Sequence, residues 1–312
     1  MRRAYLLFSF AALLTTGFLA TGFLSPAEAQ PGTVKEIVKG VWFREGEIKS
    51  MGHCNNVIIE MKDYLVLIDA NFPSGAKMVL ADAKKVSSKP IRYVFDTHHH
   101  GDHAYANAFW TRNGAETLGF PGVVEMMKMR EPKAWLDAAK SRKDVAELNL
   151  STAEPPKTVL NKNPHIMDDG TRRLEFHHFG WAHTKGDGFA WLPKDSVLAT
   201  GDAATNGAYN YLGDAYVANW PNVMKAALKL KPKHVLPGHG PAGGPEILEG
   251  EMAFMQELYA LVQAGVKAGK TPEQIAEGKL SAKVQNWVGK SFASQIKETH
   301  LEITKKAPRG SF

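Results

Sequence analysis

The sequence contains a single cysteine, Cys54, among its 312 residues. One cysteine cannot form an internal disulfide, so a fold held together by disulfide bonds is excluded. Its context, "GHCNNVIIEM", predicts a small buried side chain at the head of a strand. The sequence also lacks a dense lysine and arginine run, a short tandem repeat and a low-complexity tract. The net charge of +6 is therefore spread along the chain, and we expect no nucleic-acid partner.

Long apolar runs are absent except at the N-terminus, where "AYLLFSFAALLTTGFLATGFL" follows Arg2 and Arg3. This run and the small-x-small pattern Ala27-Glu28-Ala29 predict a secretory signal peptide over residues 1–29. The run is somewhat long for a signal peptide, so an uncleaved membrane anchor is the alternative. We therefore expect a periplasmic or secreted protein whose mature chain, residues 30–312, does not span a membrane. The oligomeric state stays open.

The mature chain is long enough for one large domain with a sizeable core. Its apolar runs are short and strand-like, and "NNVIIEM" followed by "DYLVLIDA" predicts a hairpin. The stretch "SGAKMVLADAKKVSS" has helical spacing and predicts a helix capped by Ser74. Residues 121–164 are polar and predict a helical insertion, and residues 246–312 predict a helical C-terminal tail. The order of strands, helix, strands and helix indicates two similar halves.

The stretch "THHHGDH", residues 97–103, holds four of the chain's twelve histidines. It follows "IRYVFDT", a predicted buried strand, and loops at such strand ends commonly carry the sites of α/β sheets. Residues two apart in an extended chain point the same way, so His98 and His100 can bind one ion. Asp102 and His103 can bind a second ion nearby. Imidazole and carboxylate groups are suitable zinc ligands.

Three further candidate ligands each follow a strand-like run. His183 lies in "GWAHTKGD", Asp202 in "LATGDAA" and His239 in "VLPGHG". A lone histidine or aspartate at a strand end is more often an ordinary loop residue. The order and contexts of the three together are what indicate a metal centre.

These motifs, with "VLIDAN" near residue 69, resemble those of metallo-β-lactamase superfamily hydrolases, in the same order from about residue 40 to 241. The resemblance implies an αβ/βα sandwich, in which two mixed sheets face each other and helices lie outside. It also implies that His98, His100 and His183 hold a first zinc. Asp102, His103 and His239 would hold a second, with Asp202 bridging the two. Iron or manganese are the alternative metals.

The resemblance further implies that a metal-bound hydroxide attacks a carbonyl carbon and that Asp102 also carries a proton to the leaving group. Tyr209, or its neighbour Tyr211, is a candidate donor to the substrate carbonyl, as in lactonases of this superfamily. Aromatic packing on the loop is the alternative role. Asp69 is expected to support the ligand loop, and His99 is expected to point away from the ions.

The residue at position 202 narrows the choice within the superfamily. The B1 and B2 β-lactamases carry a cysteine there, and the B3 enzymes lack a bridging aspartate. A bridging aspartate is typical of glyoxalase II-like thioesterases, acyl-homoserine lactonases and several nucleases. Export favours substrates found outside the cytoplasm, so we predict a dinuclear zinc hydrolase of a small cyclic amide or ester, of β-lactam or lactone type. The alternatives are a glyoxalase II-type ester or thioester hydrolase, an iron-dependent dioxygenase and a binding protein without turnover.

Overall fold

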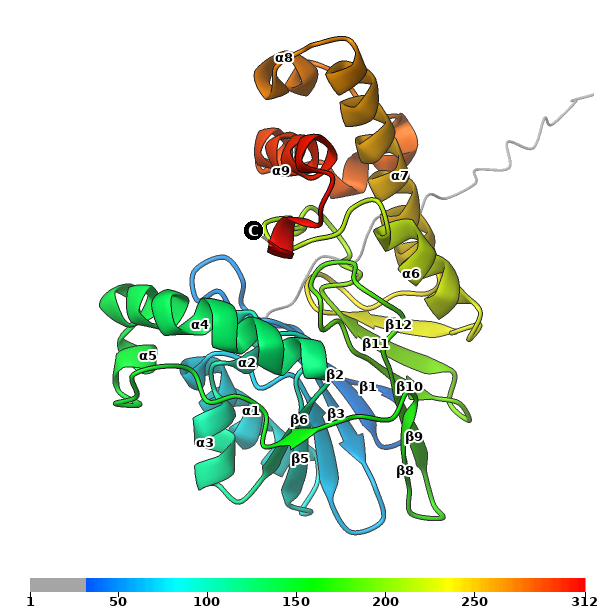
Figure 1. The fold of residues 1–312 in the computed structure, drawn as a ribbon. Coiled ribbons are helices and arrows are strands. Elements are labelled where there is room, and N and C mark those ends of the chain that lie inside the picture. Colours follow the sequence, from blue (N-terminus) through cyan, green and yellow to red (C-terminus); the bar gives the residue numbers. More distant parts are fainter. Residues whose placement is uncertain (1–31, 312) are drawn as a thin grey trace, which may run out of the picture.

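The computed structural model describes residues 32–311, so the predicted signal peptide over residues 1–29 lies outside the described residues. Two β-sheets lie face to face, and helices cover the outside of each (Figure 1). This is the αβ/βα sandwich predicted from the sequence.

The first sheet has seven strands, in the spatial order of the chain. Its strands are β1 (Val34–Val38), β2 (Val41–Arg44), β3 (Asn56–Glu60), β4 (Leu65–Ile68), β5 (Ile91–Phe95), β6 (Glu116–Gly119) and β7 (Thr158–Val159). Strands β1 to β4 are antiparallel, and β4 to β7 are parallel. The antiparallel pairing of β3 with β4 confirms the predicted hairpin.

The second sheet has five strands. In spatial order they are β12 (His234–Pro237), β11 (Val197–Gly201), β10 (Phe189–Leu192), β9 (Arg173–His177) and β8 (His165–Asp168). Strands β11 and β12 are parallel, and the remaining neighbours are antiparallel. Both sheets are therefore mixed, as the resemblance implies.

The main core lies between the two sheets. Alternation along β3 sends Val57 and Ile59 into this core and Ile58 to the outer face, because successive strand side chains point to opposite sides. The rings of Phe95 from the first sheet and Phe176 from the second lie 4.3 Å apart between centroids. Burying a side chain of this size stabilises the fold by about 1.5–3 kcal/mol.

Helices bury the outer faces. Helices α1 (Pro73–Val86) and α3 (Asn107–Arg112) cover the first sheet, and α6 (Trp220–Leu228) and α7 (Glu246–Lys267) cover the second. The prediction of Ser74 as a helix cap is wrong. The helix begins at Pro73, whose fixed φ suits the first helical position, and Phe72 occupies the cap.

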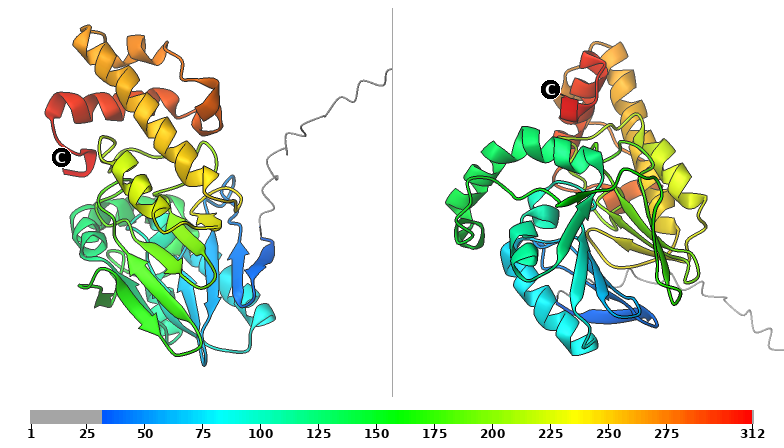
Figure 2. Two further views of the ribbon diagram at one scale, coloured as in Figure 1. Left: turned by 90° about the vertical axis from the view of Figure 1, so that its right-hand side faces the viewer. Right: turned by 60° about the horizontal axis from the view of Figure 1, so that its bottom comes forward.

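The predicted insertion contains α4 (Pro121–Ser141) and α5 (Lys143–Ala146), and its remaining residues are mostly loop. The chain after residue 267 forms further short helices. They are α8 (Pro272–Ala276), η1 (Ala282–Trp287), α9 (Phe292–Lys305) and η2 (Arg309–Ser311). One more short helix, α2 (Gly101–Ala104), follows β5 in the first half of the chain. Helices α7 to α9 lie together at one end of the sandwich, and α4 lies at the same end (Figures 1 and 2). Within residues 32–311, no helix is both long and apolar enough to cross a membrane.

A buried ion pair joins α1 to the first sheet and generates a stability prediction. Arg44 is 1% exposed, and its Nε donates to the Asp82 carboxylate at 2.8 Å. Asp82→Ala leaves the guanidinium buried without its counter-charge, and we expect a loss of about 3 kcal/mol in the free energy of unfolding at pH 7. Urea unfolding measures this loss. Asp137→Asn, which removes a carboxylate paired only with exposed lysines, is the control and should change stability little.

The effect of Asp82→Ala should depend on pH. Burial raises the pKa of Asp82, but hydrogen bonds from Lys85 and Arg44 outweigh burial and hold this pKa below its usual value. The stabilisation is therefore present above the pKa of the unfolded state, about 3.9, and is lost as the pH falls through the lower folded value. A difference between wild type and variant that grows toward pH 3 would contradict this account.

Candidate metal centre

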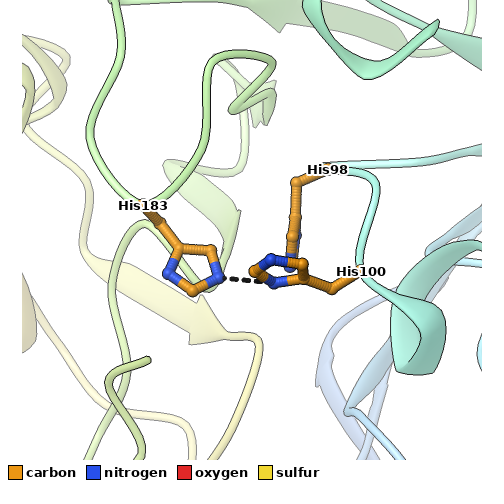
Figure 3. A group of neighbouring side chains, drawn as sticks. All are labelled: His98, His100 and His183. Carbon is orange, nitrogen blue, oxygen red and sulfur yellow. Dashed lines mark hydrogen bonds between the residues drawn. The ribbon is translucent and has the colours of Figure 1, made fainter. Parts of the chain in front are cut away.

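Three histidines from two loops form the first group of candidate ligands. His98 and His100 lie between β5 and α2, and His183 lies between β9 and β10 (Figure 3). One nitrogen of each ring lies within 4.8 Å of the other two. His183 Nε2 is 2.9 Å from His100 Nδ1. The Nδ1 of His98 is 3.0 Å from the Thr97 hydroxyl, so its Nε2 is the nitrogen left for a ligand.

Asp102, His103 and His239 form the second group, whose ligand atoms also lie within 4.8 Å of one another. Asp102 Oδ2 is 3.0 Å from His239 Nε2 and 3.4 Å from His103 Nε2. His239 follows β12 in a turn, whereas the other two residues belong to α2. The structure therefore brings together residues more than 130 positions apart in the sequence.

Asp202, directly after β11, lies between the two groups. Its Oδ2 is 3.8 Å from His183 Nε2 and 3.4 Å from His239 Nε2, and its Oδ1 is 3.3 Å from His103 Nε2. One carboxylate thus reaches a histidine of the first group and two of the second. This is the placement that a bridging ligand requires.

Burial and neighbouring charges shift the pKa values of several candidate ligands. Burial lowers the pKa of His98 well below its usual range and, with the charge of His100, lowers the pKa of His183 to about 3. Both rings are therefore neutral and keep a lone pair at neutral pH. In the second group, burial alone would lower the pKa of His239, but Asp202 and Asp102 raise it to about 9.

The chemistry of the buried atoms fits a metal ion. Among the described residues, His98 Nε2, His103 Nε2 and Asp202 Oδ1 are buried and have no hydrogen-bond partner. A buried polar atom without a partner costs about 1–3 kcal/mol. Two facing imidazole nitrogens, on His100 and His183, also need a proton or a cation between them. Zinc, which prefers histidine nitrogens and carboxylate oxygens, matches this set of donors.

Asp69 contacts the second ligand group through His103. Its Oδ2 accepts a hydrogen bond from His103 Nδ1 at 2.9 Å, and its Oδ1 accepts from the Thr97 backbone N–H at 2.8 Å. The contact fixes the proton of His103 on Nδ1, which leaves Nε2 for a ligand. Cys54 is fully buried beside His103 and Asp69, and burial raises the pKa of its thiol to about 12. The thiol therefore stays protonated, as expected of a small core residue.

Buried carboxylates also accept hydrogen bonds from the loop that carries His183 and from the loop that follows Asp202. Asp187 accepts hydrogen bonds from the backbone of Ala182 and Thr184, on either side of His183. Glu251 of α7 accepts from the Asn210 side chain at 2.6 Å and from the Thr205 backbone at 3.2 Å. The C-terminal tail is thereby fixed to the loop that follows Asp202.

A cleft of about 960 Å³ opens over the site. Its floor includes His100, Asp102, Asp202 and His239, and both Tyr209 and Tyr211 line it. Helix α4 and the end of the chain form its walls, with the residues Arg130, Glu131, Lys133, Ala134, Asp137, Glu298 and Arg309.

The two tyrosines differ in their surroundings. The Tyr209 ring lies 5.7 Å from the His239 ring between centroids, and the Tyr211 ring lies 5.4 Å from that of His100. Tyr211 is 57% exposed, whereas Tyr209 is half-buried. Both tyrosines therefore line the cleft, Tyr209 beside the second ligand group and Tyr211 beside the first.

Two carboxylates of the cleft were missed from the sequence. Glu131 of α4 accepts a hydrogen bond from the Tyr105 hydroxyl, and burial raises its pKa to about 7. Asp214 contacts His100, His99 and Arg130. His99 points to Asp214 rather than into the first ligand group. Neither carboxylate lies in a motif, and only the fold brings them to the site.

The sequence model of the metallo-β-lactamase superfamily matches residues 51–239, which is more than half of the chain. The chain therefore belongs to the metallo-β-lactamase superfamily, and the predicted family is confirmed. Homologues in this superfamily are metal-dependent hydrolases.

Individual relatives share the fold at low sequence identity. The metallo-β-lactamase type 2 of Bacteroides fragilis is 30% identical over 81 residues, 24% of this chain, and the match spans about a third of its length (32%). A metallo-β-lactamase from Pontibacter korlensis has 20% identity and a TM-score of 0.58, covering 72% of this chain and 98% of that one. FIM-1 from Pseudomonas aeruginosa, in a mono-zinc form, has 21% identity and a TM-score of 0.58, covering 73% and 96%. These structural likenesses show the fold.

The unpartnered ligand atoms predict that zinc stabilises the protein. Zinc at 100 times its dissociation constant should raise the free energy of unfolding by about 2.7 kcal/mol per site, because only the folded chain assembles the ligands. Thermal unfolding with added zinc, and again with a chelator, measures the shift. His183→Ala should remove the part of the shift that the first site contributes, about half of the total for two sites. His300→Ala, at a histidine of α9 outside the site, should preserve the whole shift. Identical wild-type unfolding with and without zinc would rule out this centre.

Proposed function

We propose that this protein is an exported, dinuclear zinc hydrolase that opens a small cyclic amide or ester of the β-lactam or lactone type. The observation that carries the proposal is the pair of ligand groups on either side of Asp202 at the floor of an open cleft. His98, His100 and His183 would hold one zinc, Asp102, His103 and His239 the other, and Asp202 would bridge them. Zinc in such a site lowers the pKa of a bound water and polarises a carbonyl oxygen.

The side chains of the chain itself have defined roles in this proposal. Asp102 lines the cleft, and contacts with His103 and His239 outweigh burial and hold the pKa of its carboxyl well below the usual range. It is therefore an ionised proton acceptor that the substrate can reach, and it can return the proton to the leaving nitrogen or oxygen. The Tyr209 hydroxyl would donate a hydrogen bond to the substrate carbonyl, where negative charge develops.

Export and domain organisation belong to the same proposal. Residues 1–29 would direct the chain to the periplasm or the medium, and residues 30–312 would form one catalytic domain. Within that domain, the insertion over residues 121–164 and the helical tail supply the walls of the cleft. A cleft of this volume suits a small molecule, in line with the 300–1,000 Å³ usual for ligand pockets.

A hydrolysis assay tests the reaction. Mature protein loaded with two zinc ions per chain should hydrolyse a chromogenic cephalosporin or a simple lactone, and a chelator should stop it. His100→Ala and Asp102→Ala should each reduce turnover by at least about 100-fold, because each removes a ligand or proton acceptor of the chemical step. Circular dichroism checks that both variants fold. Full activity in either variant would refute the assignment, and turnover of lactones alone would exclude β-lactams as substrates.

The role of Tyr209 has a separate test. Tyr209→Phe removes only the hydroxyl, and loss of one donor to a developing oxyanion lowers kcat by about 100-fold. Tyr211→Phe is the matched variant on the same loop and should leave kcat within a few-fold of wild type. Steady-state kinetics on the same substrate compares the two. A larger loss for Tyr211→Phe would transfer the role to Tyr211.

A further inference from the structure

Asp214 is a buried carboxylate that joins the ligand loop to the wall of the cleft. It is 8% exposed and lies between β11 and α6. Its Oδ2 is 3.1 Å from His100 Nε2 and 3.5 Å from His99 Nε2. Its Oδ1 is 3.1 Å from Nη2 of Arg130 in α4. Both oxygens therefore face nitrogen donors, and one of these donors belongs to a proposed metal ligand.

We infer that Asp214 positions His100 by deciding which ring nitrogen carries the proton. A neutral imidazole has one N–H and one lone pair, and an ionised carboxylate can only accept. When His100 is neutral, as a histidine that binds a metal must be, it therefore donates from Nε2 to Asp214, which leaves the lone pair on Nδ1. This Nδ1 lies 2.9 Å from His183 Nε2 and faces the first ligand group. The inference rests on the proposed metal centre.

Hydrogen bonds also fix the backbone at Asp214. Its backbone carbonyl accepts a hydrogen bond from Trp181 Nε1 at 2.8 Å. The next carbonyl, that of Ala215, accepts from the Arg309 backbone N–H, also at 2.8 Å. These contacts fix the backbone of Asp214, and Arg130 fixes the rotation of the carboxylate. His100 therefore meets an acceptor at a fixed place.

A third metal ion is not the better explanation of this cluster. His99, His100 and Asp214 do have ligand atoms within 4.8 Å of one another. The guanidinium of Arg130, however, already contacts Asp214 Oδ1, and its positive charge would repel a cation there. If His100 bound a metal ion through Nε2, its ring proton would have to move to Nδ1. Nδ1 could then no longer bind a metal ion in the first ligand group. The cluster is a hydrogen-bonded support for His100.

Replacement of Asp214 by asparagine tests the placement of the proton. Arg130 can only donate, so the amide oxygen of Asn should turn toward Arg130 and its NH₂ toward His100. The NH₂ group then donates to His100 Nε2 and forces the ring proton onto Nδ1. Asp214→Asn thus keeps the shape of the side chain and removes the lone pair from the ligand position.

The experiment measures zinc affinity by competition with a chromophoric chelator. We expect Asp214→Asn to weaken the first site by roughly 10–100-fold, the usual loss when a partner of a ligand histidine is removed. Arg130→Met alone should change the affinity little, because either oxygen of the ionised Asp214 carboxylate can accept from His100 Nε2. Arg130→Met combined with Asp214→Asn should regain most of the loss, because the amide is then free to turn its oxygen toward His100. Asp168→Asn, at an exposed aspartate paired with Arg173, is the matched control and should bind zinc as wild type does.

The cobalt(II)-loaded proteins give a second readout. The visible spectrum of the first site should change in Asp214→Asn and return toward wild type in the double variant. Thermal unfolding of the metal-free proteins shows whether each variant folds, and a misfolded variant would show weak binding that the second substitution cannot restore. Wild-type affinity in Asp214→Asn, or no recovery in the double variant, would overturn the role of Asp214. Failure of the wild-type protein to bind zinc would instead overturn the proposed metal centre.

Discussion

The site depends on how the turn after β4 holds the ligand loop. Asp69 stands at the end of β4 with a φ of 68°, and its backbone N–H donates to the Phe95 carbonyl at the end of β5. Its carboxylate then accepts from the Thr97 backbone and from His103 Nδ1. The backbone N–H groups of the next two residues donate to the His103 carbonyl. A single buried aspartate therefore ties two neighbouring strand ends together and orients a ligand, and its own burial is tolerable because these donors satisfy it.

A carboxylate contacts one histidine of each ligand group. Asp69 faces Nδ1 of His103, whereas Asp214 faces Nε2 of His100. The two rings consequently have different nitrogens left for a ligand, Nε2 in His103 and Nδ1 in His100. The groups also differ in charge, since one consists of three imidazoles and the other includes Asp102. With Asp202 between them, two carboxylates would offset half of the positive charge of two divalent cations.

The sequence was informative where a feature is local. Alternation within single strands predicted the strands and the β3–β4 hairpin, whereas the resemblance to the superfamily implied the two facing sheets. The seven candidate ligands all follow strand-like runs that are visible in the sequence. Ser74 was misassigned because Pro73, one residue earlier, already starts the helix. The backbone N–H of Val217 donates to Glu302 of the tail, a contact between residues that lie far apart in the sequence and that no local pattern marks. Asp214 was missed for the same reason, since its partners are remote in sequence and no local pattern marks them.

The tail explains how residues beyond the family match affect the cleft. The match ends at residue 239, and the chain beyond it contributes the three buried anchors Glu251, Gln295 and Glu302. Glu251 and Gln295 hold Asn210, next to Tyr209, and Glu302 holds the backbone just after Asp214. The loop between β11 and α6 therefore has two kinds of support. The common fold fixes its first residue, Asp202, and the tail fixes its later residues. A different tail on the same scaffold would move the two tyrosines that line the cleft. It would also move Asp214, which contacts His100, so the tail is coupled both to the cleft and to the first ligand group.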